Sequence, residues 1–207
     1  MKTYILLRLS VLLLILPCLV LLISVCKPPV LQTVKKNLPV IQTHYISPTY
    51  ELNSLFARLK IAKDGEEVKL VQSQIWQIWM SSGMTEIDAI MEEGNKLLAE
   101  GKYEEAIHIF TKITRRMPSY AEGWNKRATA YYLKGDFTAS LLDIERTLSL
   151  ENRHFGAFSG LASVYLAMGE YKAALKALEK VLEICPKQPR LQEQVRELYL
   201  RLGMSKA

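Results

Sequence analysis

Residues 101–106 read GKYEEA, residues 135–140 read GDFTAS and residues 169–174 read GEYKAA. In each stretch a glycine is followed two positions later by an aromatic residue, and the three glycines are spaced 34 residues apart. A fixed period of this length is typical of stacked helix–turn–helix units. The sequence therefore predicts an all-α repeat protein, a kind of fold that usually presents a surface to a partner and rarely carries chemistry of its own.

Extending this period along the chain gives three units, at residues 87–120, 121–154 and 155–188. Seven positions of each unit repeat one pattern of large and small side chains, which in two units ends in proline. In order, these positions hold Ile90, Gly94, Leu97, Ala106, Phe110, Ile113 and Pro118; then Trp124, Ala128, Tyr131, Ser140, Ile144, Thr147 and Asn152; then Phe158, Ala162, Tyr165, Ala174, Leu178, Val181 and Pro186. The pattern resembles the tetratricopeptide repeat (TPR) family over about half of the chain. The resemblance implies a right-handed solenoid of three TPR units.

The chemistry of these positions agrees with the resemblance. The eighth residue of each unit is small, and so is its partner on the second helix, which allows the two helices of a unit to cross closely. These pairs are Gly94 with Ala106, Ala128 with Ser140, and Ala162 with Ala174. The repeated glycines supply the left-handed backbone that ends each first helix. Pro118 and Pro186 stop the second helices, because proline lacks the amide that continues a helix. One unit cannot bury its apolar stripe alone, so stacking is expected to form the core.

Two helical segments flank the predicted array. Residues 51–83 are expected to form a helical hairpin that seals the first end, with Asp64 capping its second helix and Glu67 three positions on. Trp76 and Trp79 in that helix indicate heavy burial, and an aromatic platform for a ligand is the alternative. Residues 189–207 are expected to form a terminal helix with a polar outer face and a short tail.

The first 26 residues have the character of a signal anchor or transmembrane helix. Leu9 to Cys26 is an uncharged, aliphatic run that spans roughly 27 Å as a helix, and with residues 5–8 it is long enough to cross a bilayer. Cleavage as an export signal and lipidation at Cys26 are the alternatives, although Val25 is bulky where a lipoprotein box needs a small residue. Residues 27–50 contain four prolines and are expected to form an extended tether.

The formal net charge of +6 belongs almost entirely to this N-terminal part. Residues 1–50 hold five basic and no acidic residues, whereas residues 51–207 hold 22 basic and 21 acidic residues and so carry +1. The predicted domain is therefore near neutral with mixed charges, which argues against nucleic acid as a partner, because that needs a basic stripe on the folded surface.

No motif in the sequence predicts an enzyme. His44, His108 and His154 lack metal-ligand spacing, and Cys185 is the single cysteine after residue 26. Phosphate-binding loops and a nucleophile elbow are also absent from the sequence. We therefore expect no catalytic residue, no metal, no cofactor and no small-molecule substrate.

The resemblance implies a concave groove lined by the first helix of each unit. The positions that would face it hold Asp88, Met91, Asn95 and Leu98; Glu122, Asn125, Thr129 and Tyr132; and Gly156, Ser159, Ser163 and Leu166. Asparagine amides in such a groove can bind the backbone of an extended peptide. Chaperone-binding members of the family hold a terminal carboxylate with cations, and this chain matches them only at Asn95. The alternative is that these residues are ordinary solvated surface.

One departure from the family pattern predicts an ion pair. The seventh position is usually leucine, but the first two units hold Glu93 and Arg127 there. Because the two residues are one unit apart, stacking is expected to pair them, and a double-mutant cycle would measure their coupling.

The layout of signal segment, tether, hairpin and short array resembles small membrane-anchored bacterial TPR proteins. We expect a membrane-tethered adaptor at the cell envelope that binds a protein or peptide partner, with residues 5–26 in the membrane and the repeats on the non-cytosolic side. Secretion after signal cleavage is the alternative location. The alternative function is a structural or assembly subunit of a larger membrane complex.

Overall fold

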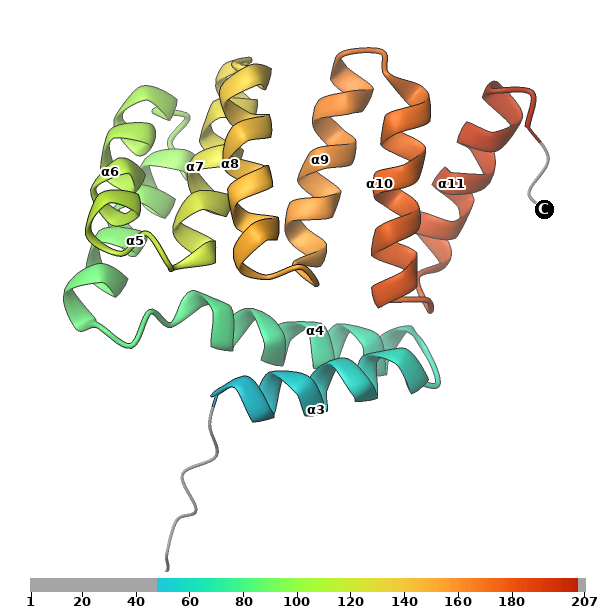
Figure 1. Ribbon diagram of the computed structural model, residues 1–207, viewed down its shortest axis with the longest axis horizontal. Coiled ribbons are helices and arrows are strands. Elements are labelled where there is room, and N and C mark those ends of the chain that lie inside the picture. Colours follow the sequence, from blue (N-terminus) through green and yellow to red (C-terminus); the bar gives the residue numbers. More distant parts are fainter. Residues whose placement is uncertain (1–47, 205–207) are drawn as a thin grey trace, which may run out of the picture. The chain divides into compact units, whose positions relative to one another are not determined.

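The structure, a computed structural model, describes residues 48–204, which lie within one compact unit. In this part of the chain it has nine helices and no strand, arranged as an all-helical solenoid (Figure 1). The helices are α3 (Pro48–Ile61), α4 (Gly65–Met80), α5 (Thr85–Ala99), α6 (Tyr103–Arg116), α7 (Ala121–Lys134), α8 (Phe137–Leu150), α9 (Phe155–Ala167), α10 (Tyr171–Ile184) and α11 (Pro189–Arg201). Within residues 48–204 no helix is long and apolar enough to cross a membrane. The anchor expected at residues 1–26 lies outside the described residues.

Three helix pairs, α5–α6, α7–α8 and α9–α10, form the repeating units. Each pair crosses closely where the sequence holds a small residue. A Cβ atom added at Gly94 would overlap the ring of Phe110 on the second helix of the same unit. In the next unit the hydroxyl of Ser140 donates a 2.9 Å hydrogen bond to the carbonyl of Ala128 across the crossing. Small side chains thus set the spacing of the two helices in a unit.

The repeated glycines end the first helix of each unit in the left-handed conformation. Gly101, Gly135 and Gly169 have φ angles of 74°, 89° and 79°. In each turn the amide after the glycine binds a carbonyl five residues back, at 2.8 to 2.9 Å, which closes the helix end. Gly203 lies 34 residues after Gly169, has a φ of 63° and ends α11 with the same hydrogen bond. Helix α11 therefore ends in the same way as the first helix of each unit.

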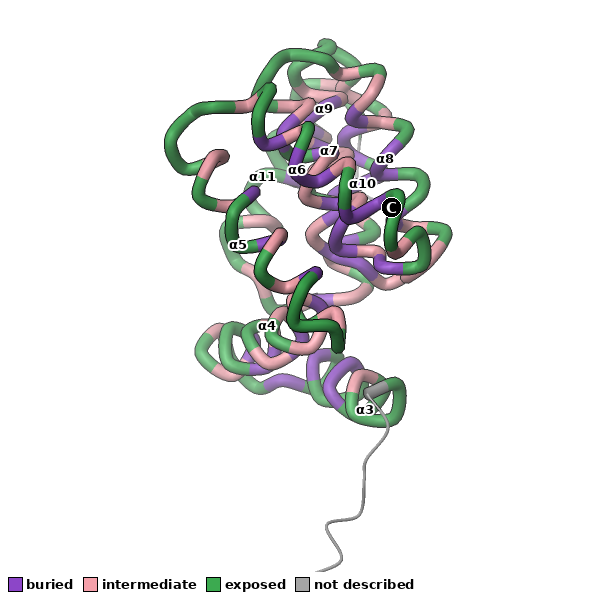
Figure 2. The backbone as a smooth tube through the Cα atoms, turned by 90° about the vertical axis from the view of Figure 1, so that its left-hand side faces the viewer, coloured by how far each residue is buried: buried purple, intermediate pink, exposed green. Residues whose placement is uncertain are grey.

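The hairpin α3–α4 does not seal the first end of the array as the sequence led us to expect. It runs along the edge where α7 and α9 begin and α10 ends, and it forms a separate layer there (Figures 1 and 2). Its buried side chains share one apolar core with Phe155, Val181 and Cys185 of the third unit. The physical reason is that buried apolar residues run along the whole of α4, from Val68 to Trp79, so this helix packs lengthwise against the array.

The ends of the hairpin also differ from the sequence prediction. Helix α3 begins at Pro48, so the last residues of the expected tether 27–50 belong to it.

At the start of α4 the carboxylate of Asp64 accepts hydrogen bonds from the amides of Glu66 and Glu67, at 3.0 and 2.9 Å, which confirms the predicted cap. Beyond the helix, the hydroxyl of Tyr120 donates to the carbonyl of Met80 at 2.9 Å, and burial raises the pKa of Tyr120.

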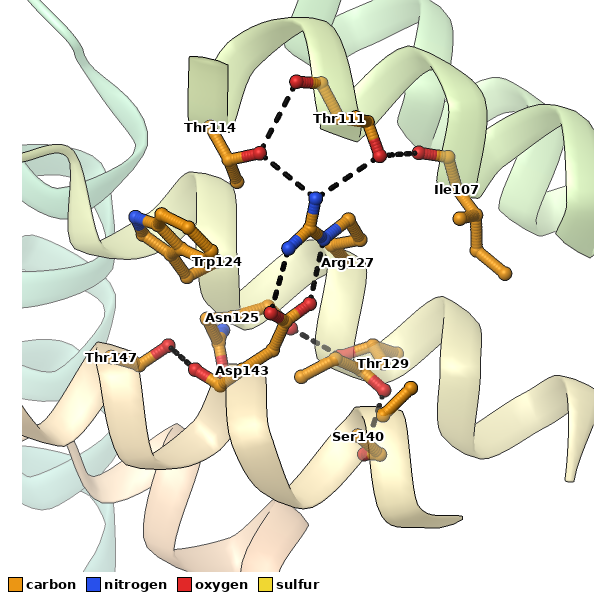
Figure 3. A network of polar contacts seen from close by, with 12 residues as sticks. Ile107, Thr111, Thr114, Trp124, Asn125, Arg127, Thr129, Ser140, Asp143 and Thr147 are labelled. Atoms are coloured by element: carbon orange, nitrogen blue, oxygen red, sulfur yellow. Dashed lines mark hydrogen bonds and ion pairs between the residues drawn. The ribbon is translucent and has the colours of Figure 1, made fainter. Parts of the chain in front are cut away.

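The predicted pair of Glu93 and Arg127 is wrong. Glu93 is exposed, whereas the guanidinium of Arg127 binds both carboxylate oxygens of Asp143 at 2.7 and 2.8 Å (Figure 3). Its third nitrogen donates to the hydroxyls of Thr111 and Thr114 on α6, at 3.1 and 3.0 Å. The side chain of Arg127 therefore points between the second helices α6 and α8, and it links two units through hydrogen bonds.

Candidate functional site

An open pocket of about 330 Å³ lies between the first helices α7 and α9. Small residues, among them Ala128, Gly156 and Gly160, line it together with the bulkier Tyr132 and Ile144. The full lining is Trp76, Asn125, Lys126, Ala128, Thr129, Tyr132, Leu133, Ser140, Ile144, Gly156, Gly160 and Ser163. Pockets for ligands share this character, since they are mostly apolar with a few well-placed polar groups.

Helix α4 contributes one side of the pocket from outside the repeats. The indole of Trp76 lies against the first turn of α9, where a Cβ atom added at Gly156 would be only 2.6 Å from Cη2 of the indole. Nζ of Lys126 lies 5.9 Å from the centre of the same ring. The hairpin therefore closes one end of the groove that the first helices form, and it takes part in the candidate site.

Directly beside the pocket lies a buried carboxylate, Glu122, with no exposed side-chain surface. It accepts hydrogen bonds from Nδ2 of Asn125 at 3.1 and 3.2 Å, and Nζ of Lys126 lies 3.6 Å away. Nε2 of His154 lies 3.0 Å from Oε2 of Glu122. These three neighbours satisfy a charge that would otherwise be costly to bury.

The hydrogen bonds of His154 assign its tautomer. Its Nδ1 accepts the amide N–H of Ala157 at 3.0 Å, so the proton of the neutral ring is on Nε2 and is donated to Glu122. The imidazole thereby caps α9 and fixes the carboxylate on α7. It is a fully buried structural histidine, with no exposed side-chain surface.

An aromatic stack attaches the hairpin to this cluster. The indole of Trp79 lies parallel to the ring of His154, with 4.0 Å between ring centres and 8° between planes. Trp76 meets His154 and Phe155 edge to face, both at 5.6 Å. Nε1 of Trp79 has no hydrogen-bond partner among the described residues, so shape and stacking hold this indole in place.

Three polar side chains of the pocket have an oxygen that is free to accept a hydrogen bond. The hydroxyl of Thr129 donates to the carbonyl of Asn125, and the hydroxyl of Ser163 donates to that of Ser159, each at 3.0 Å. The amide nitrogen of Asn125 is bound to Glu122, whereas its Oδ1 makes no hydrogen bond with any described residue. The oxygens of Asn125, Thr129 and Ser163 are therefore available to accept hydrogen bonds.

The structure brings only part of the predicted groove together. Asn125, Thr129, Tyr132 and Ser163 line the pocket, and the exposed Ser159 lies one turn away on α9. The remaining predicted residues are engaged elsewhere or outside the pocket: Met91 and Glu122 are buried, Asp88 accepts the amide of Ser82 at 2.8 Å, Leu98 and Leu166 pack against the cores of their own units, and Asn95 is half-buried on α5.

The sequence prediction of the groove omitted Trp76, Lys126, Ser140, Ile144 and Gly160 as contributors to the site. Of these residues, Trp76 had a signal in the sequence, because its pairing with Trp79 is compatible with an aromatic platform for a ligand as well as with burial. Its position over α9 depends on how the hairpin packs, which the 34-residue pattern does not contain.

Among the described residues no cluster of His, Cys, Asp or Glu has the geometry to hold a metal ion. Burial raises the pKa of the Cys185 thiol to about 11.

Two family models for the tetratricopeptide repeat match residues 91–149 and 156–188. A TPR repeat-containing protein of Rhizobium etli is 35% identical over 157 residues, which are 76% of this chain and 77% of that protein. Hsp70-Hsp90 organizing protein 2 of Arabidopsis thaliana is 28% identical over 158 residues, but the matched part is only 27% of its length.

Solved structures agree with these sequence matches. The first TPR of Spaghetti (RPAP3) bound to the HSP90 peptide SRMEEVD is 27% identical, with a TM-score of 0.53, and covers 56% of this chain and 93% of that one. The structure of MamA, at 18% identity, has a TM-score of 0.53 over 76% of this chain and 80% of that one, which shows the shared fold. The predicted all-helical repeat fold is confirmed, and the chain belongs to the tetratricopeptide repeat family.

Proposed function

We propose that this protein is an adaptor that binds an extended segment of a protein partner in the groove between α7 and α9. The observation that carries the proposal is the open pocket whose polar groups, Asn125, Thr129 and Ser163, retain free acceptor oxygens. An extended peptide has backbone N–H groups that need such acceptors. The TPR of RPAP3 bound to an HSP90 peptide supports peptide binding as a use of this fold.

The proposed ligand differs from a chaperone tail that ends in a carboxylate. The family resemblance places cations at positions that hold Met91, Gly156 and Gly160 in this chain. Met91 is buried, and Lys126, the cation that lines the pocket, faces Glu122 at 3.6 Å. Since Lys126 already pairs with Glu122, a terminal carboxylate would meet no cation that is free to neutralise it. We therefore propose an internal segment of the partner as the ligand.

Photo-crosslinking in cells tests the proposal. A photoreactive residue at Thr129, which is exposed on α7 within the pocket, is expected to capture one partner. Leu142 on the second helix α8 is 63% exposed and provides the matched control position. Equal capture from Leu142 and Thr129, or no specific capture from Thr129, would contradict binding in the groove. Asn125 is unsuitable as a crosslinking site because its amide holds the buried carboxylate of Glu122.

We also propose that residues 5–26 anchor the protein in a membrane, that residues 27–47 tether it, and that the repeats lie on the non-cytosolic side. The support for this part is the uncharged aliphatic run and its basic flanks in the sequence. Alkaline extraction of membranes tests it: the full chain is expected to stay in the membrane fraction and a variant without residues 2–26 to be released. Release of both would contradict the anchor.

A second candidate function is a subunit of a larger complex that docks through the last helix. Leu200 and Met204 at the end of the array are 73% and 44% exposed, on a surface that also includes Tyr199. Exposed apolar groups at the open end of a repeat array are a place where another protein can stack. A photoreactive residue at Leu200 that captures a partner, while Thr129 captures none, would favour this function over the adaptor.

A further inference from the structure

We propose that the pocket between α7 and α9 receives one bulky, uncharged apolar side chain of the bound segment, and that Gly160 keeps the space open for it. The inference rests on the proposed function and names the chemistry that the groove would select. Three features of the pocket support it: a glycine, Gly160, that no neighbouring side chain requires; the buried carboxylate of Glu122, which Lys126 already neutralises; and side-chain oxygens that are free to accept hydrogen bonds.

Gly160 has no structural reason to be glycine. It lies within α9 and is not among the glycines with positive φ, so its backbone suits any residue. A Cβ atom added there would meet only Cδ1 of Ile144, at an ordinary contact distance of 3.7 Å. Glycine inside a helix is destabilising relative to alanine. Its presence leaves open space in the pocket.

Other helical glycines of the array show the contrast. A Cβ atom added at Gly94 would overlap Phe110, one at Gly123 would lie 2.7 Å from Ile113, and one at Gly156 would lie 2.6 Å from Trp76. In each case a neighbouring side chain occupies the position that a Cβ would take. At Gly160 that position faces the pocket, so a ligand would take the place that a neighbour takes elsewhere.

The charges around the pocket favour an uncharged occupant. The one buried carboxylate, Glu122, is matched by Lys126 and by the donors of His154 and Asn125. Helix α9, which supplies Gly156, Gly160 and Ser163, contains no charged residue from its first to its last position. A charged side chain entering this pocket would lose its hydration without a free counter-charge, which is costly. An apolar side chain would instead bury surface against Trp76 and Ile144.

The free acceptors fix how that side chain is presented. Asn125 is 8% exposed, and its Oδ1 makes no hydrogen bond with any described residue, while Thr129 and Ser163 already donate their hydroxyl protons to backbone carbonyls. Backbone N–H groups beside an inserted apolar side chain would satisfy these oxygens. The pocket of about 330 Å³ has room for one bulky side chain and the adjoining backbone.

A phage-displayed library of random peptides, selected on the purified full chain in mild detergent, tests the proposal. The selected peptides are expected to share one apolar residue, and replacing that residue by asparagine or lysine should weaken binding about tenfold or more. Gly160→Leu, which fills the pocket, should weaken binding by a similar factor, whereas the matched Gly160→Ala adds only one methyl group and should weaken it less, by about twofold to threefold. Thr129→Val, which removes an acceptor and keeps the shape, should weaken binding by about threefold to tenfold.

Two outcomes separate this proposal from the one on which it rests. Peptides that bind Gly160→Leu as well as the natural chain, but are lost on Tyr132→Ala, would overturn the apolar pocket and leave the groove in place. Peptides insensitive to every groove substitution, or an empty selection, would overturn both. Circular dichroism checks that Gly160→Leu folds, and Ser163→Phe fills the pocket from the next turn of α9 if it does not.

Discussion

The guanidinium of Arg127 binds the carboxylate of Asp143 through two hydrogen bonds of 2.7 and 2.8 Å, with only 15% and 6% of the two side chains exposed (Figure 3). The hydrogen bonds to Asp143 raise the pKa of Arg127, so the cation is present at every ordinary pH. Removing one partner leaves a buried charge or buried polar groups unpaired. Arg127→Met is therefore expected to lower the free energy of unfolding by about 3 kcal/mol, measured by urea denaturation.

The control for this pair is Glu93, which is exposed and should tolerate Glu93→Ala within about 0.5 kcal/mol. In a double-mutant cycle, Arg127→Met and Asp143→Leu together should cost less than the sum of the two single changes, by about 1–3 kcal/mol. Additive effects of these two changes, or a coupling of Arg127 to Glu93 instead, would refute the pairing.

A second prediction compares the two described histidines. His154 is buried, caps α9 and donates to Glu122, whereas His108 is exposed on α6. His154→Ala removes these hydrogen bonds and the stack with Trp79, and it should lower the free energy of unfolding by about 2–4 kcal/mol. His108→Ala should leave it within about 0.5 kcal/mol. Similar thermal unfolding of the two variants would show that the cluster does not hold the hairpin on the repeats.

Two glycines on one helix give a third prediction. Gly156→Ala places a Cβ atom 2.6 Å from the indole of Trp76 and should destabilise the protein by about 1–3 kcal/mol, with a change in tryptophan fluorescence as the hairpin shifts. Gly160→Ala meets no such neighbour and should stabilise it by about 0.5–1 kcal/mol. The opposite order of stability in chemical denaturation would place Trp76 away from α9.

The thiol of Cys185 supplies a fourth prediction, on reactivity and pH. Burial raises its pKa from 9.0 to about 11, because the thiolate would lose its hydration in the core beneath α4. In a variant with Cys18→Ser and Cys26→Ser, a thiol reagent at pH 8 should react with the folded protein on the order of 100-fold more slowly than with the urea-unfolded chain.

The pH dependence of the same thiol has a definite sign. A folded pKa above the ordinary value means that the neutral form is favoured by folding, so its contribution to stability is complete below pH 9 and is lost as the pH rises toward 11. Comparison with Cys185→Ala over this range isolates the contribution. Rapid labelling of the native protein at pH 8 would show that Cys185 is accessible.

Much of the fold follows from local sequence. A glycine at Gly101, Gly135 and Gly169 is required by a positive φ angle, and Gly94 by the ring of Phe110. These requirements are short-range, so a single sequence reveals the period, the unit boundaries and the helix pairs. The same rule extends to Gly203, which ends α11 with a positive φ angle and lies in the sequence at the same 34-residue spacing.

The candidate site depends on contacts that the period does not encode. The pattern places Asn125 and Thr129 on the inner side of α7, but it does not place Trp76 over Gly156, because α4 lies outside the repeat. Likewise the matched charges at Glu93 and Arg127 indicated a pair one unit apart, whereas the guanidinium binds Asp143 on the second helix of its own unit. Side-chain direction, which the period leaves open, decided that contact.

The sequence by itself determined that this protein is a helical repeat array and determined its register, because backbone conformation and close helix crossing constrain residues that are near one another in the chain. Only the tertiary structure decided that the hairpin lies along the edge of the array, that Glu122 and His154 join α7 to α9 beneath it, and that a pocket remains open beside Gly160. The reason is that these contacts join distant residues, and their geometry depends on how whole helices pack.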